Sequence, residues 1–265
     1  MDLSHPKVMG IINATPDSFY DGGRNIDLDK AVQSVGKMLE DGADIIDIGG
    51  CSTKPNAEEV SLSEELDRVI PLIKTLIQKF PDIVISIDTF RSEIAKQAVE
   101  DGASIINDVS GGNLDEKMFE IVSKLQVPYI LMHMRGTPAT MQSLTEYNHL
   151  VKDVVYELSK KIEQLRSLQV NDIIIDPGFG FAKSLGQNYE MLNNLTYFKE
   201  LDYPLLVGVS RKSMIYKLLG SEPKDALNGT TALNMVALLN GANILRVHDV
   251  KEAAETVKLF NKLKN

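Results

Sequence analysis

The chain has 265 residues, 43% of them hydrophobic and 25% charged, and its formal net charge at pH 7 is −9. This composition is typical of a globular protein with a core, and no apolar run reaches the roughly 18 residues that a membrane span needs. The acidic balance and the lack of a Lys/Arg cluster argue against a nucleic-acid partner. A single cysteine and no amino-terminal signal pattern lead us to expect a cytoplasmic protein.

Short β-branched runs alternate along the chain with longer amphipathic stretches. The runs predict eight strands, at residues 8–13, 45–50, 83–88, 104–109, 128–134, 172–176, 204–210 and 243–250. The intervening stretches predict helices, among them residues 28–40, 63–79, 91–100 and 150–168. Eight strand–helix units over about 250 residues predict a single (β/α)8 TIM barrel domain at residues 1–265, with a doubly wound open sheet as the alternative.

A Gly-Ala pair before a strand is repeated at residues 40–50, 100–112 and 239–250. The glycine suits the left-handed position that ends a helix. We therefore expect a helix to end and a strand to begin in each of the three repeats.

Polar side chains follow almost every predicted strand. In a (β/α)8 barrel the carboxyl ends of the strands share one rim, and active sites lie there. The polar residues at these ends are Asn13, Asp47, Asp88, Asn107, Asp108, His133, Asp176, Ser210, Arg211, Lys212, Arg246 and His248. We therefore expect the active site at the C-terminal ends of the strands.

Asp176 opens the segment DPGFGF and has two interpretations. A turn alone explains it, because Asp, Pro and Gly suit successive turn positions. A functional role is favoured by the polar ends of the other strands. Asp88, Asn107 and Asp176 together would accept hydrogen bonds from a flat heterocycle that carries N–H groups. Lys212 would then donate to an atom of its ring.

Arg246 and His248 are two residues apart and are expected on the same face of a strand. An arginine and an imidazole at a rim suit a diphosphate, although a salt-bridged strand end explains the same pair. The Gly-rich segments at 109–113 and 178–184 match neither a P-loop nor a dinucleotide fingerprint. We predict tight turns there and assign neither segment to ATP or NAD.

Two further residues have alternative interpretations. His133 is either a ligand at the rim or a core histidine satisfied by backbone groups. Cys51 is either a reactive thiol or a small loop residue, and the second is favoured because Lys54 is the only basic residue beside it.

Eight segments, in this order, resemble the dihydropteroate synthase family of pterin-binding barrels. They are MGIINATPDSFYDGG (9–23), GADIIDIGGCSTKPNA (42–57), SIDTFR (86–91), GASIINDVSGG (102–112), MHMRGTPATMQ (132–142), DPGFGFAK (176–183), LVGVSRKS (206–213) and RVHDV (246–250). Together they extend over nearly the whole chain and are far more specific than any one of them.

The resemblance implies a transferase of folate biosynthesis. It implies that 6-hydroxymethyl-7,8-dihydropterin diphosphate condenses with 4-aminobenzoate to give 7,8-dihydropteroate, with diphosphate leaving first and a pterin-stabilised cation remaining. Mg²⁺ is the implied cofactor. The rivals are a catalytically silent pterin-binding paralogue and a methyltetrahydrofolate-binding methyltransferase, and the second would lack the SRKS and TPDSF segments present here.

Site residues follow from the same resemblance, position by position. The implied pterin pocket is Asp88, Asn107, Asp176 and Lys212. The implied diphosphate contacts are Asn13, Thr53, Arg246 and His248, with Asn13 also on the metal. The implied aminobenzoate contacts are Phe19, Thr53, Lys54, Pro55 and Ser213. The implied catalytic residues are Lys212, Arg246 and His248.

Three positions depart from the usual family form, in which Cys51 is Glu, Lys54 is Arg and Ala182 is Gly. A lysine lacks the planar fork that grips a carboxylate, so we expect looser aminobenzoate binding at Lys54.

The helix expected at residues 230–240 is apolar on more than one face. The surplus apolar surface predicts a subunit contact and a homodimer.

Overall fold

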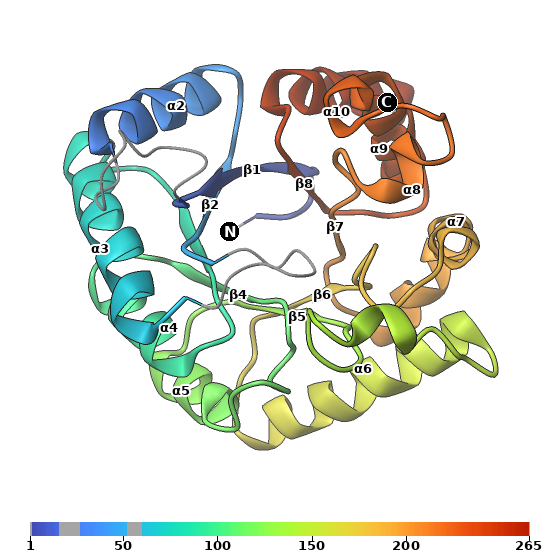
Figure 1. Cartoon of the computed structure of the whole chain (residues 1–265), viewed down its shortest axis with the longest axis horizontal. Helices are drawn as coiled ribbons and strands as arrows, with labels where there is room; N and C mark the ends of the chain where they lie inside the picture. The colour runs from blue at the N-terminus through green and yellow to red at the C-terminus, as the bar shows by residue number, and fades with distance from the viewer. Residues whose placement is uncertain (1, 16–26, 52–59, 265) are drawn as a thin grey trace.

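The computed structural model describes residues 2–15, 27–51 and 60–264, which form a barrel of parallel strands inside a ring of helices (Figure 1). The eight strands of this part of the chain pair in the order β6-β5-β4-β3-β2-β1-β8-β7. A bridge between Ile175 and Leu205 joins β6 to the segment that enters β7, and closes the barrel. The predicted (β/α)8 TIM barrel is confirmed, and the open doubly wound sheet is excluded.

The strands lie close to their predicted positions. They are β1 (Lys7–Asn13), β2 (Ile45–Gly49), β3 (Ile85–Asp88), β4 (Ile105–Asp108), β5 (Tyr129–Met132), β6 (Ile173–Asp176), β7 (Leu206–Val207) and β8 (Ile244–Val247). The predictions of 204–210 and 243–250 were too long. Only Leu206 and Val207 pair with β8, and helix α10 already begins at Val250.

Helices fill the connections and surround the barrel. They are α2 (Leu28–Glu40), α3 (Leu62–Lys79), α4 (Ser92–Glu100), α5 (Met118–Leu125), α6 (Leu150–Ser167), α7 (Leu185–Asn193), α8 (Ser213–Tyr216), α9 (Leu227–Leu239) and α10 (Val250–Lys264). The repeat glycines Gly42, Gly102 and Gly241 have φ of 104°, 118° and 105°, as predicted for helix ends. No helix in the described ranges has the length and apolarity to cross a membrane.

The interior of the barrel is apolar toward the amino ends of the strands and polar toward their carboxyl ends. One buried cluster fills the apolar part and consists of Met9, Ile45, Ile105, Ile130, Ile174, Leu206 and Ile244. Since side chains alternate along a strand, the residues two positions further on also point inward. On four strands these residues are Asp47, Asn107, Asp176 and Arg246. These four residues form a polar layer, which lies next to the apolar cluster on the side of the carboxyl ends of the strands.

Candidate active site

The centre of the polar layer is an ion-pair network around Arg246. The Arg246 Nε lies 2.6 Å from Asp47 Oδ2, and its Nη2 lies 2.6 Å from Asp88 Oδ2. Asn107 Nδ2 donates a hydrogen bond of 3.0 Å to the same Asp47 oxygen. The structure thus brings together three of the sequence-predicted residues, and Asp47 connects them.

Burial sets the charge state of this network. It raises the pKa of Asp88 to about 7, against the opposing attraction of the Arg246 guanidinium. Burial alone would lower the pKa of Arg246, but the carboxylates of Asp47 and Asp88 raise it above its ordinary value. The guanidinium therefore stays charged beside both carboxyl groups.

Two buried oxygens of the polar layer have hydrogen-bonding capacity left. Asp47 Oδ1 and Ser86 Oγ have no hydrogen-bond partner within the described part of the chain. The two residues are register partners on β2 and β3. Since buried polar atoms are nearly always hydrogen-bonded, this pair is suited to a polar ligand or water inside the mouth.

Asp176 and Lys212 form the other half of the polar layer. The Asp176 Oδ1 accepts a hydrogen bond of 2.7 Å from the Gly178 amide, so the turn interpretation is correct. Lys212 Nζ donates to the Phe179 carbonyl of the same turn. Burial raises the pKa of Asp176, and the ammonium of Lys212 and the guanidinium of Arg246 oppose that rise. Asp176 is therefore both a turn residue and a member of the charged mouth.

Lys212 contributes a half-buried ammonium to the layer. Burial lowers its pKa to about 8, although the carboxylate of Asp176 favours the charged form. The neighbouring Arg211 is different, because its guanidinium pairs with Asp249 at 2.8 and 2.9 Å. Its charge is largely neutralised by that pair, so Arg211 is not a free cation for an anionic substrate.

The remaining predicted residues lie at the outer edge of the mouth. Asn13 ends β1 and is exposed, and the half-buried Ser213 begins α8 directly after Lys212. His248 is exposed just beyond β8 and lines a hollow of about 430 Å³ together with Lys37 of α2. Arg246, by contrast, is paired inside the barrel. Phe19, Thr53, Lys54 and Pro55 lie outside the described residues.

Cys51 lies beside the buried carboxylate of Glu65, which the sequence did not indicate. Its Sγ is 3.1 Å from Glu65 Oε2 and 3.8 Å from Arg91 Nη1. The premise that Lys54 is the only basic neighbour was therefore wrong, because the fold brings Arg91 in from the end of β3. Burial and the Glu65 carboxylate nevertheless raise the pKa of Cys51 to about 12. The thiol is unreactive, as we expected.

His133 fits neither of its two interpretations. It is only 3% exposed, with Nε2 at 3.0 Å from Glu157 Oε2 and Nδ1 at 3.1 Å from Lys183 Nζ. Both ring nitrogens are engaged by side chains, so the ring is neither open to a ligand nor satisfied by backbone groups. The burial of Lys183 was not predicted, because nothing in the segment GFGFAK distinguishes a buried lysine from an exposed one.

The structure allows a test of whether the implied Mg²⁺ suits this site. Among the described residues, no three His, Cys, Asp or Glu side chains gather into a metal-binding cluster. Asn13 offers one amide oxygen, a ligand type that Mg²⁺ accepts. Since Mg²⁺ commonly keeps its waters and binds one or two protein groups plus substrate phosphates, Asn13 fits a metal that arrives with the diphosphate.

Known proteins match this chain over nearly its full length. A family model described as pterin binding enzyme matches residues 9–248. The dihydropteroate synthase of Synechocystis sp. is 47% identical over 259 residues, which are 97% of this chain and 89% of that protein. The chain belongs to the dihydropteroate synthase family. The resemblance carried by the eight segments is confirmed.

Solved structures of the family agree with this fold. The Yersinia pestis dihydropteroate synthase in a sulfonamide drug complex has a TM-score of 0.93 at 43% identity and matches 100% of this chain and 96% of its own. The Xanthomonas albilineans dihydropteroate synthase in complex with 7,8-dihydropteroate has a TM-score of 0.89 at 37% identity, over 100% of this chain and 95% of its own. A dihydropteroate synthase is a transferase of folate biosynthesis, as the sequence led us to expect.

Proposed function

We propose that the chain condenses 6-hydroxymethyl-7,8-dihydropterin diphosphate with 4-aminobenzoate, and that the polar layer is where the pterin binds. One observation carries this proposal. Carboxylates, an amide and two cations from segments far apart in the sequence meet at a single mouth, in a chain of the dihydropteroate synthase family. The Xanthomonas albilineans relative, with 7,8-dihydropteroate bound, supports the product.

The polar layer suits a pterin in shape and in hydrogen-bonding pattern. A pterin is flat and presents N–H groups along one edge, and a carboxylate accepts two parallel hydrogen bonds from such an edge. Asp176 is fixed for this by the Gly178 amide. Asn107 contributes an amide oxygen as an additional acceptor, because its Nδ2 is already used on Asp47.

The charges of the layer favour departure of the diphosphate before attack by the amine. The C–O bond breaks with its electron pair going to diphosphate, and positive charge appears on the pterin methylene. The carboxylates of Asp47, Asp88 and Asp176 surround the pterin site and stabilise that charge electrostatically. The aromatic amine then forms the C–N bond and loses a proton, so an activated nucleophile is not needed.

The departing diphosphate is assigned to Arg246, His248 and Asn13. When bound, Mg²⁺ neutralises phosphate charge there. Asn13 is the residue on this chain that would hold the metal, together with phosphate oxygens.

Calorimetry tests this assignment of Asn13 without turnover. Mg²⁺ should bind the wild-type protein measurably only with diphosphate present, and Asn13→Ala should weaken that binding several-fold. If the two proteins bound Mg²⁺ equally well, Asn13 would not be a metal ligand.

The decisive experiment incubates the pure protein with both substrates and Mg²⁺. A synthase releases diphosphate only when 4-aminobenzoate is present, and dihydropteroate appears in equal amount. A silent paralogue would bind the pterin and yield no product. A methyltetrahydrofolate-binding methyltransferase is disfavoured by the SRKS segment and by the family match.

Three further assignments belong to the same proposal. Ser213 lies beside Lys212 at the mouth and is assigned to 4-aminobenzoate with Phe19, Thr53, Lys54 and Pro55. The single cysteine supports a cytoplasmic location. The apolar helix α9 supports a homodimer.

A further inference from the structure

Lys183 is a buried cation with no role in the proposed reaction. Its side chain is 3% exposed, and Nζ lies 3.1 Å from the Gly178 carbonyl, 3.0 Å from the Phe181 carbonyl and 3.1 Å from His133 Nδ1. An ammonium has three N–H donors, and here each has an acceptor. A buried lysine satisfied in this way holds the groups around it in one arrangement.

The groups that Lys183 holds are those that support the pterin site. The Gly178 amide fixes Asp176, and the Phe179 carbonyl accepts from Lys212. Only glycine fits at position 178, because a Cβ there would collide with the His133 carbonyl, and its φ is 72°. The ammonium thus braces both ends of the turn whose backbone hydrogen-bonds to Asp176 and Lys212, two of the predicted pterin contacts.

Lys183 also acts on Asp176 through its charge. Its ammonium lowers the pKa of Asp176 against the effect of burial, alongside Lys212 and Arg246. Burial lowers the pKa of Lys183 to about 7, with Asp176 and Glu157 favouring the charged form and Lys212 and Arg135 opposing it. The ammonium charge is therefore present at mildly acidic pH and disappears as the pH rises above neutrality.

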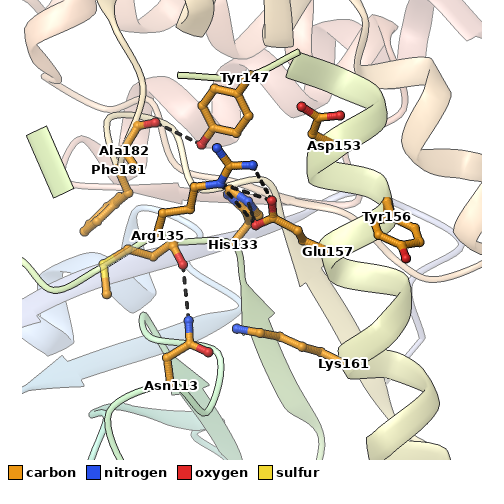
Figure 2. A network of polar contacts seen from close by, with 12 residues as sticks. Asn113, His133, Arg135, Tyr147, Asp153, Tyr156, Glu157, Lys161, Phe181 and Ala182 are labelled. Carbon is orange, nitrogen blue, oxygen red and sulfur yellow. Dashed lines mark hydrogen bonds and ion pairs between the residues drawn. The ribbon is translucent and has the colours of Figure 1, made fainter. Parts of the chain in front are cut away.

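A polar cluster behind Lys183 fixes its orientation. Burial lowers the pKa of His133 to about 4, so the ring is neutral, and we assign the Nδ1 lone pair to Lys183 and the Nε2 proton to Glu157. Figure 2 shows Glu157 reaching from α6 to His133 and Arg135, with Tyr147 on the other side of the guanidinium. Burial would raise the pKa of Glu157, but the hydrogen bonds from His133 and Arg135 lower it to about 2.

We propose that Lys183, braced by His133 and Glu157, is a positioning residue that holds the 178–181 turn, and with it the Asp176 carboxyl group, in place for pterin binding. This inference rests on the proposed function. It assigns Lys183 no contact with substrate and no part in bond making.

The test measures the Kd of 6-hydroxymethyl-7,8-dihydropterin diphosphate by calorimetry at pH 6 and pH 8.5, for the wild-type protein and Lys183→Met. At pH 6 the variant lacks both the hydrogen bonds and the charge, and its Kd should rise about tenfold or more. At pH 8.5 the wild-type lysine is largely uncharged, so the ratio of the two Kd values should be several-fold smaller. Lys212 and Asp88 titrate in this range in both proteins.

Lys161→Met is the matched control, because Lys161 is another partly buried lysine beside the same cluster. Its Nζ lies 3.4 Å from the Ser110 carbonyl and does not contact the 178–181 turn. Figure 2 shows it on α6 together with Glu157. Its pterin Kd should stay within about twofold of wild type at both pH values.

Glu157→Gln keeps the inference testable if Lys183→Met does not fold, since Glu157 is half-buried on an outer helix. Without this carboxylate the ammonium of Lys183 is less favoured, so the pterin Kd should rise most near pH 7 and least at pH 8.5. A folded Lys183→Met with unchanged Kd at pH 6, or with the same ratio at both pH values, overturns the inference. A wild-type protein that binds no pterin overturns the proposed function instead.

Discussion

Carboxylates outnumber cations inside the barrel mouth. Asp47, Asp88 and Asp176 lie around Arg246 and Lys212, which are the cations that face them. Such a site favours a ligand that donates hydrogen bonds and becomes positive during reaction. The carboxylates would repel a diphosphate, so its charge has to be met by Arg246 inside the mouth and by Asn13 and His248 at the outer edge.

Replacing Asp176 by Asn tests the pterin assignment at a single residue. The amide offers one acceptor and turns an N–H donor toward the donors of the ligand, so pterin binding should weaken by about 2 kcal/mol, or roughly thirtyfold in Kd. Calorimetric titration with the dihydropterin diphosphate measures the change.

The control for this prediction is Asp172→Asn, the same change before the other end of β6, where the side chain is exposed. It should leave pterin binding as in wild type. If the two variants bind the pterin equally well, Asp176 does not contact it.

Individual residues were predictable where the strand pattern places them. Asp88, Asn107 and Asp176 were expected at one mouth because parallel strands end at one rim. The partners of Arg246 and the burial of Lys183 were not, since each depends on residues more than forty positions away. A local sequence window contains no information on such contacts.

His133 follows β5 and contacts Glu157 of α6, and the burial of its ring makes the stability of the protein depend on pH. The pKa of His133 is lowered from 6.5 to about 4, so between these values the unfolded chain binds more protons than the folded one. The stability is complete above pH 6.5 and declines as the pH falls toward 4. The decline should reach about 3 kcal/mol at most.

Urea unfolding at pH 7.5 and 4.5 measures this effect. His133→Leu should be less stable at pH 7.5 than wild type, and its free energy of unfolding should depend less on pH. His149→Leu, at the exposed histidine before α6, should keep the wild-type dependence because His133 is intact. An unchanged pH dependence in His133→Leu would contradict the assigned neutral ring.

Most elements were predictable because their periodicity is local. α2 begins and ends where the amphipathic pattern does, and the Gly-Ala repeats mark three helix ends. The limits of β7 and β8 were not, since a strand ends where its neighbour stops pairing. After Val207 the chain no longer pairs with β8, although Gly208 and Val209 remain buried.

At the scale of the whole molecule, an apolar surface on one side of the barrel supports the predicted homodimer. The exposed large residues there, on and near α8 and α9, are Leu218, Leu219, Val236 and Leu239. Figure 1 shows these two helices next to each other at the edge of the ring. Patches of this kind are often buried by a second subunit.

Light scattering at micromolar concentration should therefore give twice the monomer mass of 29.3 kDa. Leu239→Lys should shift the protein toward the monomer, because a charge would have to be buried in the contact. Leu168→Lys, after α6, is the control and should leave the mass unchanged. A wild-type protein found only as monomer would refute the homodimer.

The barrel as a whole was predictable from the number and spacing of its strands, since eight parallel strands with covering helices close into one sheet. The position at which the barrel closes was not predictable from the sequence. Among the described residues, the single bridge from Ile175 to Leu205 is the sheet pairing between β6 and the β7 segment.

This closing seam separates the strand that ends at Asp176 from the segment that leads to Lys212. Of all the strand pairs in the described residues, it has the fewest backbone pairings. Local opening of the barrel should therefore begin between β6 and the β7 segment. A ligand that contacts both Asp176 and Lys212 would connect the two sides of this seam. Ligand and barrel would therefore steady each other, and amide exchange around Ile175 and Leu205 would slow most once the mouth is filled.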